Sequence, residues 1–232
     1  FKKNRKDTDL KLNLFPTDIA HIQGLFDWMT EPALCFVRKH VVEMCPTVDT
    51  NLITSLLGIL EALLAQSFEK YANKETGEDE EVTDAKVLRQ RLQDIECCYI
   101  FALVWSIGKT GDLHSQMLFS KFLTEIIASL DVIEADYPQV NNALLMREWV
   151  KPDFAVATQV KGMLAMPMPI REHFFEYTYV PAESKWKSWA DMLPAYKVPD
   201  GSAYSTIVVP NIYSMQVQYC IELLVPLNKH VL

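Results

Sequence analysis

The stretch Cys97-Cys-Tyr-Ile-Phe-Ala-Leu-Val-Trp-Ser-Ile107 decides the fold, because as a helix it is apolar on every side. A helix that is hydrophobic all round must be buried, so other helices have to surround it. The preceding residues from Asp84 carry most of the charges. We therefore expect one helix over 84–107, exposed in its first half and buried in its second, and a mainly α fold.

Apolar residues at helical spacing predict further helices around this stretch. Pro32 is tolerated in a first turn, so Glu31-Pro32 is expected to open a new helix. Asp49 or Thr50 is expected to accept backbone N–H groups at the start of another. Gly108 to Gly111 is predicted to be a turn. The expected helices cover, approximately, residues 16–29, 31–44, 46–68 and 113–130.

The composition changes after Asp131, since eight of the 12 prolines fall between positions 138 and 210. We interpret 131–203 as a linker with a small β element, in which 168–180 forms a strand. Trp186 and Trp189 are expected to cover an edge of the core. From Tyr204 a new module is predicted: a strand over 205–210, an amphipathic helix over 212–224, and a second buried strand beginning before Val231-Leu232.

Charge and composition exclude several classes of function. The net charge of -8 and the absence of a basic patch argue against a nucleic-acid partner. No apolar run is expected to reach the roughly 18 to 20 residues of a membrane span, so no membrane partner is expected. The five cysteines are odd in number and lie in apolar stretches, which is typical of reduced core thiols in the cytoplasm. No spacing of cysteine and histidine suits a metal site.

Gly108-Lys109-Thr110 has the letters that end a phosphate-binding loop. That loop needs a glycine five residues earlier, where the chain bends around phosphate. The residue there is Leu103, within the predicted helix. We therefore interpret Gly108-Lys109-Thr110 as a turn between helices.

Paired carboxylates are the remaining candidates for catalysis. Asp94 with Glu96, and Asp131 with Glu134, are interpreted as surface acids, because neither pair is placed in a pocket. No catalytic residue and no metal ligand is predicted, so the chain by itself is not expected to be an enzyme.

Five motifs occur in a fixed order: Phe36-Val-Arg-Lys39 with Pro46-Thr-Val-Asp-Thr-Asn-Leu52, Phe101-Ala-Leu-Val-Trp-Ser-Ile-Gly108, Leu118-Phe-Ser-Lys-Phe-Leu123, Phe175-Glu-Tyr-Thr-Tyr-Val-Pro181 with Trp186-Lys-Ser-Trp189, and Ser205-Thr-Ile-Val-Val-Pro210. Together they resemble the dynein heavy chain family, in its axonemal (ciliary) branch. Two positions depart from the family pattern. Asn211-Ile-Tyr-Ser214 replaces a Thr-x-Asp-Thr-like sequence, and Lys109 stands where another small residue is common.

The resemblance implies a place in the motor ring, between its second and third AAA+ modules. Residues 1–9 would end the large subdomain of the preceding module, and 10–130 would be the helical lid of the second module. Residues 131–203 would be an extension between modules with a small β element. Residues 204–232 would supply the first strand and helix of the third, α/β module.

The resemblance also implies function. ATP or ADP, with Mg²⁺, would bind at flanking modules of the parent chain and not to this segment alone. The segment would couple ATP-driven changes between modules, for microtubule-based movement in the axoneme of a cilium or flagellum. Neighbouring modules, intermediate and light chains, and microtubules would be the partners. The adenine of the third module would lie beside Ile207, Val208, Val209 and Pro210, and Thr47 and Asn51 would face the nucleotide of the second.

Two alternatives stay open from the residues. A stand-alone helical module could bind a partner helix without catalysis. A small ATPase could use Gly108-Lys109-Thr110, which an absence of hydrolysis would exclude.

Overall fold

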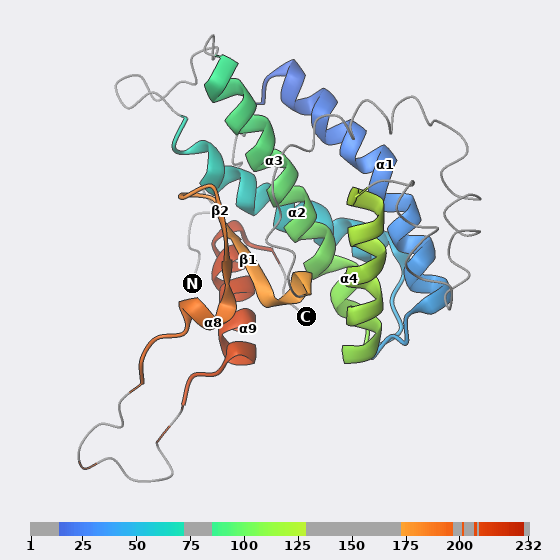
Figure 1. The fold of residues 1–232 in the computed structure, drawn as a ribbon, viewed down its shortest axis with the longest axis vertical. Helices are drawn as coiled ribbons and strands as arrows, with labels where there is room; N and C mark the ends of the chain where they lie inside the picture. The colour runs from blue at the N-terminus through green and yellow to red at the C-terminus, as the bar shows by residue number, and fades with distance from the viewer. Residues whose placement is uncertain are drawn as a thin grey trace, which may run out of the picture.

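The computed structural model describes residues 14–71, 85–128, 173–196, 201, 207 and 209–229 (Figure 1). In this part of the chain four long helices, α1 (Pro16–His40), α2 (Asp49–Phe68), α3 (Ala85–Ser106) and α4 (Leu113–Ala128), form a bundle. A short hairpin, β1 (Tyr177–Val180) and β2 (Lys185–Ser188), is followed by α8 (Trp189–Met192) and α9 (Ile212–Leu224). The mainly α fold with a small β element is confirmed.

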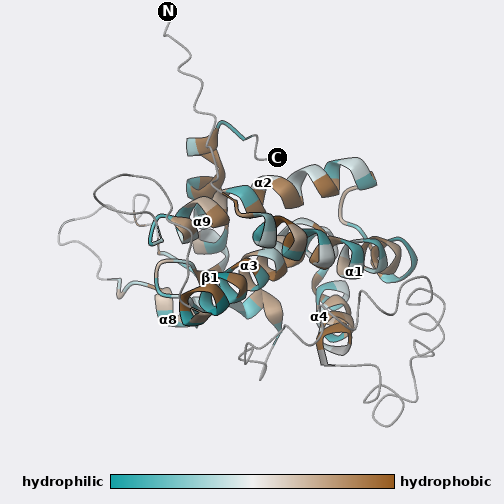
Figure 2. Cartoon of the chain, turned by 90° about the horizontal axis from the view of Figure 1, so that it is seen from above, coloured by the Kyte–Doolittle hydropathy of each residue, from teal (hydrophilic) through white to brown (hydrophobic). Residues whose placement is uncertain are grey.

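α3 is the central helix of the bundle, as the apolar sequence predicts. α1, α2 and the hairpin pack around it, and α4 joins the bundle through α1 and the turn at Gly108–Thr110 (Figure 1). Tyr99, Phe101 and Leu103 are at most 1% exposed. Apolar residues mark α2 and α3 along much of their length in Figure 2. The core of the molecule therefore lies around the second half of α3.

α1 corrects one prediction, because Pro32 lies inside it and does not open a new helix. Proline lacks the N–H that would donate to the carbonyl of Trp28, four residues earlier, so the local rule favours a break. Burial of Met29, Ala33 and Phe36 on both sides of Pro32 offsets that loss. The helix ends at His40, which leaves Met44 outside it and 75% exposed.

α2 begins at Asp49, but the predicted cap is wrong. The residue before the helix is Val48, and no side chain caps the helix start. Asp49 binds Arg38 instead. By length and composition α2 could cross a membrane, contrary to the expectation from sequence. The core helix of a soluble protein passes the same test, and 56% of this stretch is buried within the structure. We interpret α2 as a core helix.

The burial of α3 starts earlier than predicted. Only its first turns are exposed, and Arg91, Asp94 and Glu96 are at most 1% exposed. The interpretation of Asp94 and Glu96 as surface acids is therefore wrong. Glu96 and Arg91 each pair with a buried residue of α1: Glu96 binds His21 at 3.0 Å, and Arg91 binds Asp18 at 2.9 Å. Asp131 and Glu134 lie outside the described residues.

The hairpin is shorter than the predicted strand over 168–180. Residues 168–172 lie outside the described part, and Phe174–Glu176 forms the 3₁₀ helix η2 before β1. The two strands pair antiparallel, with Tyr179 opposite Trp186. Trp189 is 0% exposed and therefore lies inside the core and not at its edge, whereas Trp186 is partly buried against the core. Against α3, η2 places the ring of Phe175, 6.4 Å from that of Trp105, and β1 places the hydroxyl of Tyr179, which donates to Asp94.

The predicted helix over 212–224 is confirmed as α9. Asn211 caps it: its Oδ1 accepts from the N–H of Ser214, and the hydroxyl of Ser214 accepts from the N–H of Asn211. The strand predicted over 205–210 is not formed at Ile207, Val209 or Pro210. The strand predicted to begin before Val231-Leu232 falls largely outside the described residues.

Candidate functional site

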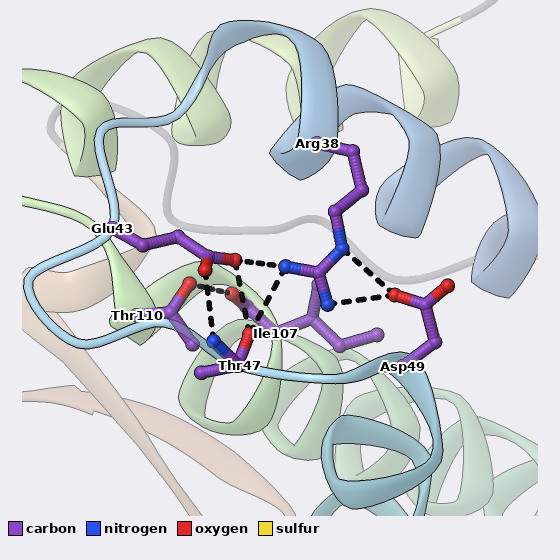
Figure 3. Close-up of polar contacts among 6 residues, drawn as sticks. All are labelled: Arg38, Glu43, Thr47, Asp49, Ile107 and Thr110. Carbon is purple, nitrogen blue, oxygen red and sulfur yellow. Dashed lines mark hydrogen bonds and ion pairs between the residues drawn. The ribbon is translucent and has the colours of Figure 1, made fainter.

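The start of α2 is surrounded by a network of four polar side chains, drawn in Figure 3. The Arg38 guanidinium donates to Asp49 Oδ1, at 2.9 Å from Nε and 2.7 Å from Nη2. Arg38 Nη1 also pairs with Glu43 and donates to the Thr47 hydroxyl at 3.1 Å. Thr47 in turn donates both its N–H and its hydroxyl to the Glu43 carboxylate, at 3.0 and 2.9 Å. One cation thus holds two acids beside the helix start.

The loop that carries this network is tied to the turn between α3 and α4. The N–H of Met44 donates to the carbonyl of Thr110 at 3.0 Å, and the N–H of Asp112 donates to the carbonyl of Val42 at 3.1 Å. The Ser115 hydroxyl accepts from the N–H of Val42 at 3.0 Å. These bonds fix the start of α2 relative to α3 and α4, so the three elements would move together.

A second polar cluster, which the sequence did not reveal, surrounds Asp94. Its carboxylate accepts hydroxyl bonds from Tyr71 at 2.6 Å and Tyr179 at 2.5 Å, and pairs with Lys70 Nζ at 2.5 Å. Lys70 also donates to the carbonyl of Pro181 at 2.8 Å. These groups come from the turn that follows α2, from α3 and from the hairpin. We call them the Asp94 cluster.

The Asp94 cluster holds a charge in the core. Burial by itself would raise the pKa of Asp94, but the hydrogen bonds from Lys70, Tyr179 and Tyr71 outweigh it, and the pKa is lowered. Burial, together with the bond to Asp94, raises the pKa of Tyr71. The tyrosines therefore stay neutral donors and Asp94 stays ionised. Ser67 and Gln90 also donate to this carboxylate, each at 3.3 Å, so it accepts from five side chains, and removing it would take the charged acceptor from the hydroxyls of Tyr71 and Tyr179.

The same hairpin holds α9. The Tyr219 hydroxyl donates to the carbonyl of Tyr179 at 3.3 Å, and the Gln216 amide donates to the carbonyl of Phe175 at 3.2 Å. The ring of Tyr219 lies edge-on to Trp189, with centroids 5.4 Å apart. Tyr179 therefore binds the bundle through its hydroxyl and α9 through its carbonyl.

Residues 22–191 match the protein family described as the dynein heavy chain AAA lid domain. The chain belongs to this family. The bundle from Ile22 onward and the hairpin lie within the matched range, so these parts form the dynein lid, and α9 follows it.

Curated relatives agree with the family. Dynein axonemal heavy chain 1 of Rattus norvegicus is 26% identical over 90% of this chain. Dynein axonemal heavy chain 3 of Homo sapiens is 21% identical over 82% of it, and the dynein-1-alpha heavy chain of the flagellar inner arm I1 complex of Chlamydomonas reinhardtii is 20% identical over 91%. The chain spans only 5%, 4% and 4% of the lengths of these three relatives.

Gly108-Lys109-Thr110 is a turn in this dynein lid, as predicted. It forms the 3₁₀ helix η1, and the Thr110 hydroxyl donates to the carbonyl of Ile107 at 2.9 Å. Lys109 Nζ donates to Gln116 at 3.2 Å and lies 5.1 Å from the ring centre of Trp105. Both polar side chains are engaged within the lid, so the turn does not offer a phosphate-binding loop.

The structure places Thr47 and Asn51 together at the start of α2. The Thr47 hydroxyl is engaged with Arg38 and Glu43, while Asn51 is exposed in the first turn, where its N–H donates to the carbonyl of Val48 at 3.0 Å. A helix start without a side-chain cap favours anions. Asp49 opposes this, and Arg38 partly neutralises it. The nucleotide-facing role of these two residues stays a prediction.

The predicted adenine-side residues lie elsewhere, before α9. Val209 is 59% exposed, Ile207 and Pro210 are partly exposed, and Val208 lies outside the described residues. Their role in binding adenine stays a prediction. Within the described ranges, no group of three or more acidic, histidine or cysteine side chains could hold a metal ion.

Proposed function

We propose that this dynein lid belongs to the second AAA+ module of an axonemal-type heavy chain, and that it passes nucleotide-driven movement to the third. Residues 10–130 would be the lid, 131–203 the extension, and 204–232 the start of the third module. The observation that carries the proposal is the attachment of α9, the first helix assigned to the third module, to the lid.

The attachment of α9 has three parts. Gln216 and Tyr219 bind backbone carbonyls of the hairpin segment. The ring of Tyr219 contacts that of Phe101 on α3, with centroids 5.8 Å apart. Lys229, just after α9, pairs with Glu61 of α2 at 2.7 Å. Because packed helices move as rigid bodies, a rotation of the lid would carry α9 with it.

The nucleotides belong to the flanking modules in this proposal. ATP or ADP, with Mg²⁺, would bind there, with Ile207, Val208, Val209 and Pro210 on the adenine side of the third module. Thr47 and Asn51 would face the nucleotide of the second. The segment itself would contribute no catalytic residue. The parent chain would be an ATP-hydrolysing microtubule motor with intermediate and light chains, working in the axoneme.

The substitution Gln216→Leu in the parent heavy chain tests the coupling. Gln216 is 5% exposed, and leucine would leave the carbonyl of Phe175 without its donor. We expect slower microtubule gliding at an unchanged basal rate of ATP hydrolysis. The matched control is Gln218→Leu, on the same helix but exposed, where its amide binds only Glu222 at 2.7 Å.

Wild-type gliding and wild-type microtubule-stimulated hydrolysis in Gln216→Leu would contradict the coupling role. Equal slowing in both variants would also contradict it, because of these two glutamines Gln216 alone binds outside α9, at the carbonyl of Phe175. A lid that binds a partner helix while the parent chain shows no ATP-dependent gliding would favour the alternative of a helical interaction module.

A further inference from the structure

α9 carries apolar side chains on two separate faces. Its inner face packs on the bundle and the hairpin through partly or fully buried residues, among them Met215, Tyr219, Leu223 and Leu224. A second apolar stripe runs at intervals of four residues along the outer side: Tyr213, Val217, Ile221 and Val225 are 68%, 58%, 42% and 55% exposed. We call these four residues the outer stripe.

A different side of α9 is polar and faces the solvent. Ser214, Gln218 and Glu222 are exposed at the same four-residue spacing and form a polar stripe of their own. A surface helix needs one apolar face, whereas a helix that is apolar over most of its circumference is typical of a buried position. The outer stripe is thus surplus to the packing of α9 on this dynein lid. Both views place α9 on the opposite side of the bundle from α4 (Figures 1 and 2).

We propose that the outer stripe docks on an apolar, uncharged surface of another folded part of the same heavy chain. α9 would then be held between the lid and that part, and would be the contact through which the lid acts. This inference rests on the proposed function, in which the lid is one segment of a long motor chain. The relatives support a partner within the chain, because this segment spans only 4% to 5% of their lengths.

The size of the outer stripe argues for a tethered partner. A whole aromatic side chain such as Tyr213 offers about 150 to 250 Å², and the three aliphatic side chains offer less each. With about half of each side chain exposed, the outer stripe amounts to roughly 300 to 400 Å². A stable interface between separate proteins buries about 800 Å² on each partner. A contact half that size suffices when the partner is attached, since a tether raises the effective concentration to about the millimolar range.

The chemistry of the stripe argues against a membrane or a second copy. Helices that lie on membranes carry lysine or arginine beside their apolar face, and α9 contains neither. Glu222, exposed beside the stripe, would be repelled by an anionic lipid surface. A second copy would have no tether to compensate for the small area.

Thiol labelling of Val217→Cys tests the docking. The matched control is Gln218→Cys, the next residue, which lies on the polar stripe. Each variant is labelled with a maleimide, both in this chain and in the parent heavy chain, and the modified peptide is quantified by mass spectrometry. This resolves the new thiol from the five native cysteines. We expect Val217→Cys to react at least about tenfold more slowly in the parent chain than in this one, because docking buries it. Gln218→Cys should react at similar rates in both.

Equal rates for Val217→Cys in the two chains would overturn the proposal, and so would protection of both positions, which would not single out the stripe. Sedimentation of this chain covers the second copy: self-association that Val217→Glu abolishes would make another copy the occupant. Binding to phosphatidylcholine vesicles that Val217→Glu abolishes would make it a lipid surface. If Val217→Cys reacts equally fast in both chains while Gln216→Leu still slows gliding, the docking proposal fails and the proposed function stands. The failures of the two proposals are therefore distinguishable.

Discussion

Gly108 begins the turn between α3 and α4, and we expect Gly108→Ala to destabilise the fold. An added Cβ would lie 2.5 Å from Cδ1 and 2.6 Å from Cε1 of Phe119, and 3.0 Å from Cζ of Phe175. Phe119 is 0% exposed, and its ring contacts Phe36 and Phe122, with centroids 6.1 and 5.8 Å away. The ring is therefore enclosed and cannot turn aside without moving its neighbours.

The magnitude follows from two opposing effects. An extra methyl group in a well-packed core costs about 1 to 3 kcal/mol. Replacing glycine by alanine also restricts the unfolded chain, which returns about 0.4 to 1 kcal/mol. Because the contacts with Phe119 would be shorter than 3.0 Å, the cost lies near the upper end of its range, and the net loss in the free energy of unfolding is about 2 kcal/mol. For a chain of this length, each 1 kcal/mol lowers Tm by about 2 to 4 °C.

Gly58 provides the opposite case within the same bundle. It is buried in α2, yet a Cβ there would meet nothing closer than Leu224 and Lys229 atoms at 4.0 Å, which is ordinary contact. Alanine in the interior of a helix is favoured over glycine by about 0.5 to 1 kcal/mol. We therefore expect Gly58→Ala to stabilise the chain by that amount.

Urea unfolding of this chain, followed by tryptophan fluorescence, measures both variants. The midpoint should fall in Gly108→Ala and rise in Gly58→Ala, with the slope m unchanged, because neither substitution alters the surface exposed on unfolding. A neutral or stabilised Gly108→Ala would refute the argument that the ring of Phe119 is enclosed and cannot move aside. A destabilised Gly58→Ala would refute the argument that α2 has room for a Cβ at this position.

Two further predictions concern the Asp94 cluster and the adenine side. Asp94→Asn should lower the free energy of unfolding by about 2 kcal/mol at pH 7, because the hydroxyls of Tyr71 and Tyr179 lose a charged acceptor, whereas Lys70 keeps the carbonyl of Pro181. Because folding lowers the pKa of Asp94, the stability that its charge contributes is fully present above the pKa of the unfolded chain and is lost as the pH falls through the folded pKa. Urea titrations at acid pH test this. A difference in the free energy of unfolding between wild type and Asp94→Asn that does not narrow there would contradict it. In the intact ring, changing Val208 and Pro210 should weaken nucleotide binding at the third module, and unchanged affinity would exclude the adenine role.

Local sequence patterns predicted the helices well where one rule decided the outcome. The apolar run before Ile107, the amphipathic repeat of α9 and the turn at Gly108 all follow from spacing alone. Pro32 shows where such rules fail, since the preference for a helix start competes with the burial of Met29 and Phe36 on the same helix. That burial depends on packing against α3 and α4, which no local window contains.

The polar clusters were beyond reach for a related reason. Asp94 looks like a surface acid because its donors, Lys70, Tyr71 and Tyr179, stand 24, 23 and 85 positions away in the sequence. Asp49 looks like a helix cap because its partner, Arg38, lies on the preceding helix and so outside the local sequence window. In both cases the tertiary fold supplies a charged partner that outweighs the local preference. No local signal distinguishes Asp94, because it lies in the charged part of α3 that precedes the apolar run from Cys97.

The two ends of Tyr179 define one hydrogen-bonded route from the bundle to α9, beside the direct contact of Phe101 with Tyr219. Its hydroxyl binds Asp94 on α3 and its carbonyl accepts from Tyr219 on α9. A displacement of α3 therefore reaches α9 through one residue of a paired strand, with no flexible segment between. Asp94→Asn would act on the first bond and Gln216→Leu beside the second, so the two variants separate loss of stability from loss of coupling. If the lid transmits force by this route, Asp94→Asn should impair gliding in proportion to its effect on the hairpin, whereas Gln216→Leu should impair gliding in a bundle of near wild-type stability.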